Sequence, residues 1–209
     1  MLEWAEGHLA VPDADGITGL EVFAFDYDSP RVRLLQERGY AQTPSREVTR
    51  RLRLGQHRPP GPKIATGYVM RTTLPVEADF QAVATLLNAA FRRATHTAEE
   101  SRTFREHSPS FDVDLELVAE TPGRALAALV GVTYDEENRR GIFEPVCTHP
   151  DHLRRGLALA LMHEGQIRLR ALGTADAYVG TGDDKAPNRL YESAGFTEAY
   201  RGRVWRKAP

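Results

Sequence analysis

The sequence contains a single cysteine, Cys147, among its 209 residues. An internal disulfide and a metal cluster built on cysteines are therefore both excluded. There is no run of eighteen apolar residues and no signal-peptide pattern, so we expect no membrane association and a cytoplasmic location. The formal net charge of -2 gives no excess of positive charge for a general nucleic-acid-binding role.

The composition that remains is typical of a globular enzyme. Hydrophobic residues make up 41% of the chain and charged residues 27%, and the length fits one large or two small domains. The histidines do not indicate a metal site: His149 and His152 are three residues apart in an expected turn, without a partner at helical spacing. We therefore predict no bound metal.

The segment EPVCTHPDHLRRGLALA (Glu144–Ala160) predicts a strand, a short basic loop and a buried helix in succession. The strand should end at His149, because the residue before a proline avoids the helical region. A helix that starts after Gly156 would direct backbone N–H groups and the positive end of its dipole at one spot, where a phosphate can bind. The alternative is an ordinary turn with solvated arginines.

Pro145 affects the strand before this loop. Proline cannot donate to a sheet ladder, so we expect a bulge or a splayed strand there. Glu144 alternates with Val146 and Thr148, which predicts that these three share one face of the strand. Cys147 should then point to the opposite face as a packed core thiol.

A second pattern follows about thirty residues later. A strand-like run, Asp176–Thr181, leads through a polar stretch and a short helix to Gly195-Phe196. Together the two segments resemble the GNAT (Gcn5-related N-acetyltransferase) family, whose acyl-CoA signature is V-x-V-x-P-x-x-R/Q-x-x-G-x-G/A. The matching residues are Val146, Thr148, Pro150, Gly156 and Ala158, then Asn188, Tyr191, Gly195 and Phe196. Leu153 departs from the family's Arg or Gln, at a position that acts mainly through its backbone N–H. The resemblance covers the chain from about Tyr68 to its end.

The resemblance implies an α/β (α+β) GNAT fold, a mixed and mostly antiparallel sheet flanked by helices. It also implies acetyl-CoA as co-substrate. The acyl-CoA site that it implies comprises Val146, Cys147, Thr148, Leu153, Arg154, Arg155, Gly156, Leu157, Ala158 and Asn188.

Two further residues are candidates for catalysis. The resemblance implies that Tyr191 lies near the thioester sulphur as general acid to the leaving thiolate; the alternative is an aromatic side chain packed in the core. Glu144, a carboxylate on an otherwise apolar strand, is the candidate acceptor of the amine proton. It could equally bind the substrate's ammonium or form a salt bridge with Arg140.

The N-terminal third contains a weak internal repeat. At an offset of 156 residues, Glu21–Tyr40 aligns with Ala177–Phe196 with four identities in twenty positions. Leu35 then lies opposite Tyr191, so the first copy should bind no acyl-CoA. We expect residues 1–54 to be a partial, degenerate GNAT-like half unit, 55–65 a linker, and 66–209 the complete domain. Coincidence is the alternative.

The function predicted is an acetyl-CoA-dependent transfer of an acetyl group to a primary amine of a small molecule or peptide, in a ternary complex. The alternative is a non-catalytic acyl-CoA-binding regulatory or scaffold module. Two basic segments, REVTRRLRL and RVWRK, are interpreted as solvated edge strands, not as a nucleic-acid surface. The acceptor should be bound by residues 79–110, none of which identifies it. An uncovered sheet edge favours a homodimer.

Overall fold

The computed structural model describes residues 2–12 and 18–207, whose contacts form two compact units. The small unit consists of the described residues within 1–50, 180–189 and 198–209. The large unit consists of residues 51–179 and 190–197. Segments from both ends of the chain therefore build the small unit, whereas the sequence led us to expect a division near residues 54 and 66.

The large unit contains a mixed, mostly antiparallel sheet, as expected from the sequence. Its strands lie in the order β8-β7-β6-β5-β4, and each neighbouring pair is antiparallel except β7 and β8. The strands are β4 (Val69–Thr72), β5 (Glu116–Glu120), β6 (Leu126–Asp135), β7 (Arg140–Thr148) and β8 (Asp176–Gly182). The last residues of β8 belong to the small unit.

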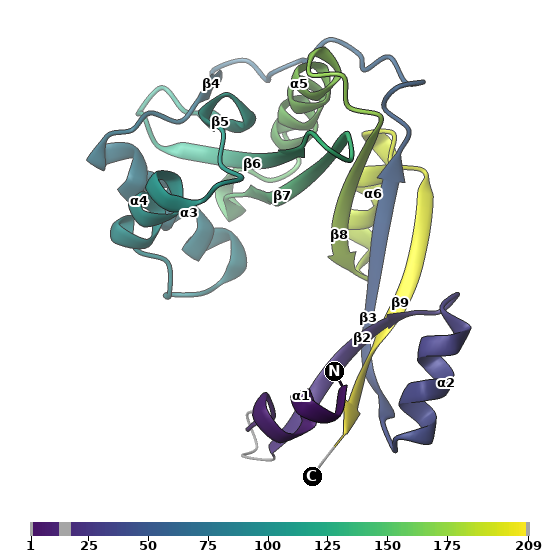
Figure 1. Ribbon diagram of the computed structural model, residues 1–209. Coiled ribbons are helices and arrows are strands. Elements are labelled where there is room, and N and C mark those ends of the chain that lie inside the picture. Colours follow the sequence, from purple (N-terminus) through teal and green to yellow (C-terminus); the bar gives the residue numbers. More distant parts are fainter. Residues whose placement is uncertain (1, 13–17, 208–209) are drawn as a thin grey trace. The chain divides into compact units, whose positions relative to one another are not determined.

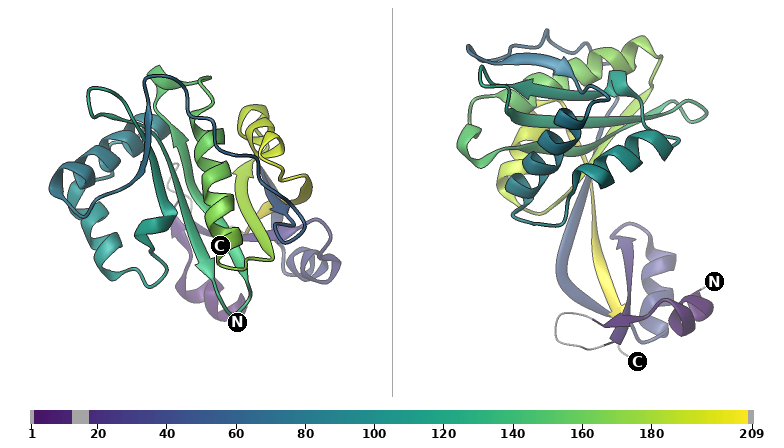
Figure 2. Two further views of the ribbon diagram at one scale, coloured as in Figure 1. Left: turned by 90° about the horizontal axis from the view of Figure 1, so that it is seen from above. Right: turned by 90° about the vertical axis from the view of Figure 1, so that its left-hand side faces the viewer.

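Helices cover both faces of this sheet, as Figures 1 and 2 show. Helices α3 (Glu77–Phe91) and α4 (Ala98–His107) lie on one face, and α5 (Leu157–Ala171) lies on the other. The apolar core is divided accordingly: one cluster packs between α3 and the sheet, and a larger one packs between the sheet and α5.

The helices form where the sequence pattern predicts them. Phe80, Val83 and Leu86 recur at helical spacing in α3 and are buried. In α5, Leu161 and Met162 are completely buried, and each contributes about 1.5–3 kcal/mol of hydrophobic stabilisation. Helix α4 begins with a capping box, in which Thr97 and Glu100 satisfy each other's backbone N–H groups.

The stretch between β3 (Ala41–Leu52) and β4 is irregular, as a linker would be. Residues 53–68 contain no helix or strand. It is nevertheless packed, because Leu54 is fully buried and Ile64 and Ala65 contact the core of the large unit.

The small unit is a second sheet region with its own core. Its strands lie in the order β1-β2-β9-β3, and its helices are α1 (Leu2–His8) and α2 (Ser29–Glu37). The strands are β1 (Val11–Pro12), β2 (Thr18–Phe25), β9 (Glu198–Lys207) and β3 (Ala41–Leu52), of which β3 ends in the large unit. The basic segments predicted as edge strands form β3 and β9. For RVWRK that prediction is wrong, because β9 pairs with β2 on one side and β3 on the other.

The helices of the two proposed repeat copies begin and end at aligned positions. Helix α6 (Lys185–Ser193) begins and ends 156 residues after α2 (Ser29–Glu37), the same offset that separates Gly195 from Gly39. Both glycines end their helix in the left-handed region, with φ of 82° for Gly39 and 93° for Gly195.

The hydrogen bonds that end the two helices also correspond. The N–H of Tyr40 donates to the carbonyl of Leu35 at 2.9 Å, and the N–H of Phe196 donates to the carbonyl of Tyr191 at 2.9 Å. Leu35 and Tyr191, aligned by the repeat, are each the buried residue of their helix. This agreement supports the repeat that we propose for the N-terminal segment.

No helix in residues 2–12 and 18–207 is both long and apolar enough to span a membrane. The same residues contain no group of three or more His, Cys, Asp or Glu side chains arranged to hold a metal ion.

An ion pair in the large unit fixes the start of α3. Both carboxylate oxygens of Asp79 accept from Arg71, at 2.6 and 3.0 Å, and one also accepts from the N–H of Leu74 at 2.8 Å. Burial alone would raise the pKa of Asp79, but these bonds outweigh it and lower the pKa below 3.8. The buried carboxylate is therefore stabilised as an anion.

We expect Asp79→Asn to lower the free energy of unfolding by about 2–3 kcal/mol at pH 7, because it leaves the half-buried guanidinium of Arg71 with Glu120 as its remaining carboxylate partner. A carboxyl group with a lowered pKa stabilises the fold above its ordinary pKa. The difference between the variant and the parent should thus shrink as the pH falls below 3.8. Urea unfolding at pH 7 and pH 3 measures both effects.

The matched control is Glu77→Gln in the same first helical turn, whose side chain is 63% exposed where it pairs with Arg102. This variant should unfold at nearly the parent's urea concentration. Equal stability of Asp79→Asn and the parent at pH 7 would contradict the role given to the ion pair.

Candidate active site

Strand β7 separates from β8 partway along its length. It pairs with β6 from Arg140 to Thr148, but its pairing with β8 ends at Ile142. The backbone from Phe143 to Thr148 therefore has no strand partner on the β8 side among the described residues. Its free N–H and C=O groups can bond to an extended ligand lying along this edge.

A bulge lies where the two strands separate. The register between β6 and β7 shifts between Val130 and Val132, opposite Glu144 and Pro145, which confirms the bulge expected at the proline. Gly131 allows the close approach: a Cβ atom there would lie 2.7 Å from the carbonyl oxygen of Glu144 and 2.9 Å from Cδ of Pro145. A larger residue would push the strands apart.

The bulge changes which side chains share a face. Cys147 packs with residues of α3, and Glu144 lines a cavity on the same side. Phe143 and Val146 pack with the core that faces α5. The prediction that Glu144 and Val146 share one face, with Cys147 opposite, is therefore wrong. Its physical reason is the extra residue in the bulge, which breaks the two-residue alternation.

The loop after β7 has the geometry of an anion site. A short 3₁₀ turn, η2 (Pro150–His152), is followed by two left-handed residues, Arg154 with φ of 59° and Gly156 with φ of 73°. Helix α5 begins at Leu157, and no side chain caps its N-terminus. The first N–H groups of this helix have no partner within the helix, so they can bind a phosphate together with the positive end of the dipole.

The side chains of this loop leave room for a ligand. A Cβ atom on Gly156 would meet nothing within 4 Å. Leu157 and Ala158 are buried, so they can contribute only backbone groups, whereas Leu153 is 54% exposed and Arg154 and Arg155 are exposed. The structure thus brings the predicted residues Leu153 to Ala158 together around one open spot.

Two residues that the sequence did not single out for binding hold this loop. The hydroxyl of Tyr68 lies 2.8 Å from Nδ1 of His152, and the guanidinium of Arg155 lies 6.0 Å from the centre of the Tyr68 ring. Tyr68 is 84 residues from His152 in the chain, and no local pattern reveals such a pairing.

Tyr191 lies buried beside the bulged strand. Burial, followed by the influence of Cys147 and Glu144, raises its pKa from 10.0 to about 12. The phenol therefore stays protonated at physiological pH and can donate a hydrogen bond. Burial also raises the pKa of Cys147 to about 12, so this thiol is an inert core group.

The side chain of Asn188 is hydrogen-bonded within the small unit. Its side-chain oxygen accepts from Nε of Arg50 at 2.7 Å, and its amide nitrogen donates to the carbonyls of Gly182 at 3.0 Å and Asp184 at 2.7 Å. By its contacts it belongs to the small unit. Its side chain holds the turn before α6 and has little capacity left for a ligand.

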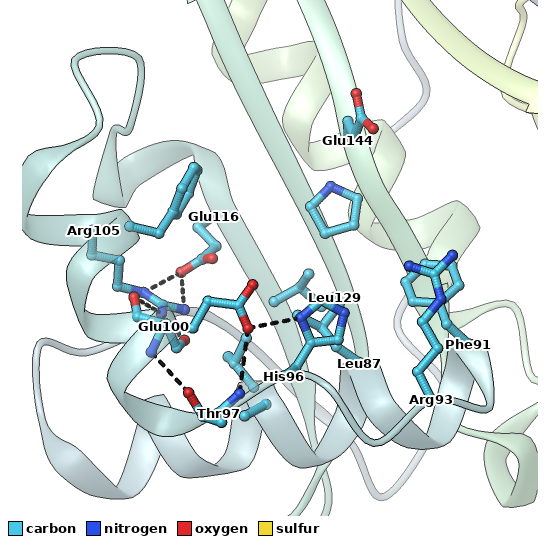
Figure 3. A pocket seen from close by; sticks show the side chains of 15 residues that line it. Leu87, Phe91, Arg93, His96, Thr97, Glu100, Arg105, Glu116, Leu129 and Glu144 are labelled. Atoms are coloured by element: carbon cyan, nitrogen blue, oxygen red, sulfur yellow. Dashed lines mark hydrogen bonds and ion pairs between the residues drawn. The ribbon is translucent and has the colours of Figure 1, made fainter. Parts of the chain in front are cut away.

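A cavity of about 500 Å³ opens beside Glu144 (Figure 3). Most of its lining comes from residues 79–110, where we expect the acceptor to bind. The rest comes from β5, β6 and β7. Its apolar wall consists of Val83, Ala84, Leu87, Phe91, Phe104, Leu129 and Pro145. Its polar wall consists of Arg93, His96, Thr97, Glu100, Ser101, Arg105, Glu116 and Glu144. Apart from Glu144, sequence reasoning named none of these polar residues as a site residue.

Glu144 carries a carboxylate without a partner in the described chain. The salt bridge with Arg140 considered from the sequence is not formed. Glu144 lies at one end of the cavity lining, on the bulge (Figure 3), and its exposed side chain is available to a ligand that enters from α3 and α4. A free carboxylate at this point can attract an ammonium group or accept its proton.

The comparisons with known proteins agree with this architecture. A sequence profile described as "Acetyltransferase (GNAT) family" matches residues 80–196. A search of curated protein sequences found no significant match.

Several solved structures share the fold. A GCN5-related N-acetyltransferase from Sphaerobacter thermophilus has a TM-score of 0.79 at 22% identity, covering 99% of this chain and 66% of that one. A tandem GNAT protein from the clavulanic acid biosynthesis pathway has a TM-score of 0.71 at 15% identity, covering 91% and 64% respectively. A GCN5-related N-acetyltransferase from Kribbella flavida has a TM-score of 0.62 at 16% identity, covering 90% of this chain and 68% of that one. The chain thus spans about two thirds of the length of these structures.

Proposed function

Because the chain belongs to the acetyltransferase (GNAT) family, we propose that it is an acetyl-CoA-dependent N-acetyltransferase that acts on a primary amine. The observation that carries this proposal is a path along the chain with three parts: the uncapped N-terminus of α5 with its loop, the edge of β7 that is unpaired on the β8 side, and Glu144 beside the cavity. Each part of the path suits one part of the reaction.

The donor fits the first two parts. The uncapped N-terminus of α5 and the basic loop suit the pyrophosphate of CoA. The unpaired edge of β7 between Phe143 and Thr148 suits the amide-containing pantetheine arm, which can bond to a strand edge as another strand would. Backbone N–H groups of the same edge can polarise the thioester carbonyl.

The chemistry then requires three proton transfers. Glu144 accepts a proton from the acceptor's ammonium, and the neutral amine attacks the thioester carbonyl. The new C–N bond forms as the C–S bond breaks, and the electron pair of the C–S bond goes to the CoA sulphur. Tyr191 donates its hydroxyl hydrogen to this thiolate, and the second proton of the attacking nitrogen then passes to the Tyr191 phenolate, which leaves the neutral amide and the CoA thiol. Glu144 releases its proton to solvent.

The two residues are electrostatically coupled. Burial is the main cause of the raised pKa of Tyr191, followed by Cys147, and the negative charge of Glu144 adds the smallest part. Once Glu144 has taken up the amine proton, that contribution disappears and Tyr191 becomes a stronger acid. The phenol thus gains acidity during the same turnover in which the thiolate leaves.

We also propose that the N-terminal segment is a GNAT-like half unit without a donor site of its own. The matching helix ends and the offset shared by α2 and α6 support it. At the position of Tyr191 this segment carries Leu35, which has no hydroxyl to donate. The fold likeness of the chain to a tandem GNAT protein agrees with the proposal.

The first test is thermal unfolding with increasing CoA, acetyl-CoA and dephospho-CoA. We expect a saturable rise in melting temperature with the first two ligands, since a ligand at 100 times its dissociation constant stabilises by about 2.7 kcal/mol. A panel of primary amines should then cause thiol release from acetyl-CoA, measured with a thiol reagent.

The outcomes separate two functions. A melting shift without thiol release from any amine would favour the non-catalytic acyl-CoA-binding module. The absence of any shift at millimolar CoA would contradict both. Dephospho-CoA reports whether the 3′-phosphate adds to binding beyond the pyrophosphate.

A further inference from the structure

Two groups of opposite charge in the cavity have no partner of opposite charge within the described residues: Glu144 on β7 and Arg93 in the loop after α3. The other charged groups of the wall are paired. His96 lies 3.2 Å from the carboxylate of Glu100, and Nη2 of Arg105 lies 2.6 Å from that of Glu116. Glu144 and Arg93 are therefore the two charged groups of the wall that no neighbouring side chain of the described residues holds.

The loop that carries Arg93 is held in place. The backbone N–H of Arg93 donates to the carbonyl of Asn88 at 3.0 Å. The side chain of Asn88 then bonds to the backbone of His96 twice, accepting from its N–H at 3.0 Å and donating to its carbonyl at 2.8 Å. Residues 93–96 are thus anchored at both ends to the last turn of α3.

The guanidinium itself is positioned by an aromatic ring. It lies 5.5 Å from the centre of the Phe91 ring, a cation–π contact. Figure 3 shows the Arg93 side chain extending beside Phe91 toward β7, on which Glu144 stands. A flat guanidinium supported on one face by a ring can still receive a carboxylate along its edge, with two parallel hydrogen bonds.

The rest of the cavity is apolar. Val83, Leu87 and Leu129 line it next to the two charges. A ligand with a positive and a negative group could satisfy both Glu144 and Arg93, and its uncharged part would remove the apolar wall from water. A ligand with only an amine would leave Arg93 unpaired, and a ligand with several charges would place some of them against apolar side chains.

We propose, on the basis of the acetyltransferase function above, that the acceptor is an amino acid with an apolar side chain. Its ammonium group faces Glu144, its carboxylate faces Arg93, and its side chain occupies the apolar part of the cavity. Arg93 is thus a specificity-determining residue that selects amines carrying a carboxylate.

The test uses matched pairs of acceptors that differ only in the carboxylate: phenylalanine with phenethylamine, and leucine with 3-methylbutylamine. We expect kcat/KM for each amino acid to exceed that of its decarboxylated partner at least about tenfold, the factor that 1.4 kcal/mol of binding supplies. Arg93→Gln should reduce this ratio to about threefold or less, mainly through a higher KM for the amino acid. Aspartate and lysine should be poor acceptors.

Arg92→Gln is the matched control. Arg92 is the neighbouring exposed arginine, and it is not among the residues that line the cavity. This variant removes the same charge and should keep the preference for the carboxylate. Melting temperatures of both variants establish that they are folded.

The outcomes distinguish this inference from the function on which it rests. If the amino acid and the amine of each matched pair are acetylated at equal rates, the inference is overturned and the transferase function still stands. If no acceptor is turned over, calorimetric titration of phenylalanine into the protein with CoA decides: binding that Arg93→Gln weakens supports the amino-acid site, and no binding overturns it. If Arg92→Gln abolishes the preference for the carboxylate as fully as Arg93→Gln does, the inference is also overturned.

Discussion

Replacing Tyr191 with phenylalanine should lower kcat by about 100-fold, within the range that one positioned proton donor supplies. The variant keeps the buried ring and loses only the hydroxyl group, so affinity for acetyl-CoA should change little. Because the pKa of Tyr191 is raised to about 12, the parent should show no loss of rate from ionisation of this phenol up to about pH 10. Steady-state kinetics and a melting curve with CoA measure the two effects separately.

Tyr134→Phe is the control for this substitution. Tyr134 lies on β6, and its hydroxyl donates to the carbonyl of Leu172 at 3.0 Å, away from the bulge. Its loss should cost about 1 kcal/mol of stability without a change in kcat. If Tyr191→Phe retains the parent's kcat, Tyr191 serves only as a packed aromatic and another group must protonate the thiolate.

The order of elements around the site could be predicted from the sequence because each signal is local. Pro145 indicates a bulge, His149-Pro150 ends the strand, and Gly156 precedes an unbroken apolar run that can only be a buried helix. These features depend on backbone sterics of one or two residues. They therefore hold regardless of how distant parts of the chain pack.

The face of the sheet that each side chain after the bulge occupies could not be predicted from the sequence of β7 alone. Strict alternation placed Glu144 and Val146 together. The observed arrangement depends on a register shift against β6, where Gly131 allows the bulged backbone to approach. The length and position of a bulge are properties of the strand pair, and a single strand's sequence contains only half of that information.

The lining of the cavity and the composition of the small unit were missed for a related reason. Arg93 and Glu116 belong to segments far apart in the sequence, and neither lies in a motif. Strand β9 pairs with β2, which precedes it by more than 170 residues. Such pairings follow from long-range packing, which periodicity within one segment does not encode.

The largest effect on donor binding should come from Gly156→Asp. A Cβ atom at this position meets nothing within 4 Å, so the carboxylate would occupy the open spot before α5. A negative charge about 4 Å from a phosphate is unfavourable by about 4 kcal/mol at an effective dielectric of 20. We expect affinity for CoA to fall by at least about 100-fold, measured by calorimetric titration and by the loss of the CoA-induced melting shift.

Gly173→Asp, at the other end of the same helix, separates charge repulsion from loss of stability. Gly173 also has a left-handed φ, 82° against 73° for Gly156, and a Cβ atom there is equally unobstructed. Aspartate is stabilising at a helix N-terminus and destabilising at a C-terminus, so Gly173→Asp should be the less stable of the two variants. It should nevertheless bind CoA like the parent, whereas the more stable Gly156→Asp should not. If both variants bind CoA normally, the phosphates do not lie at the N-terminus of α5.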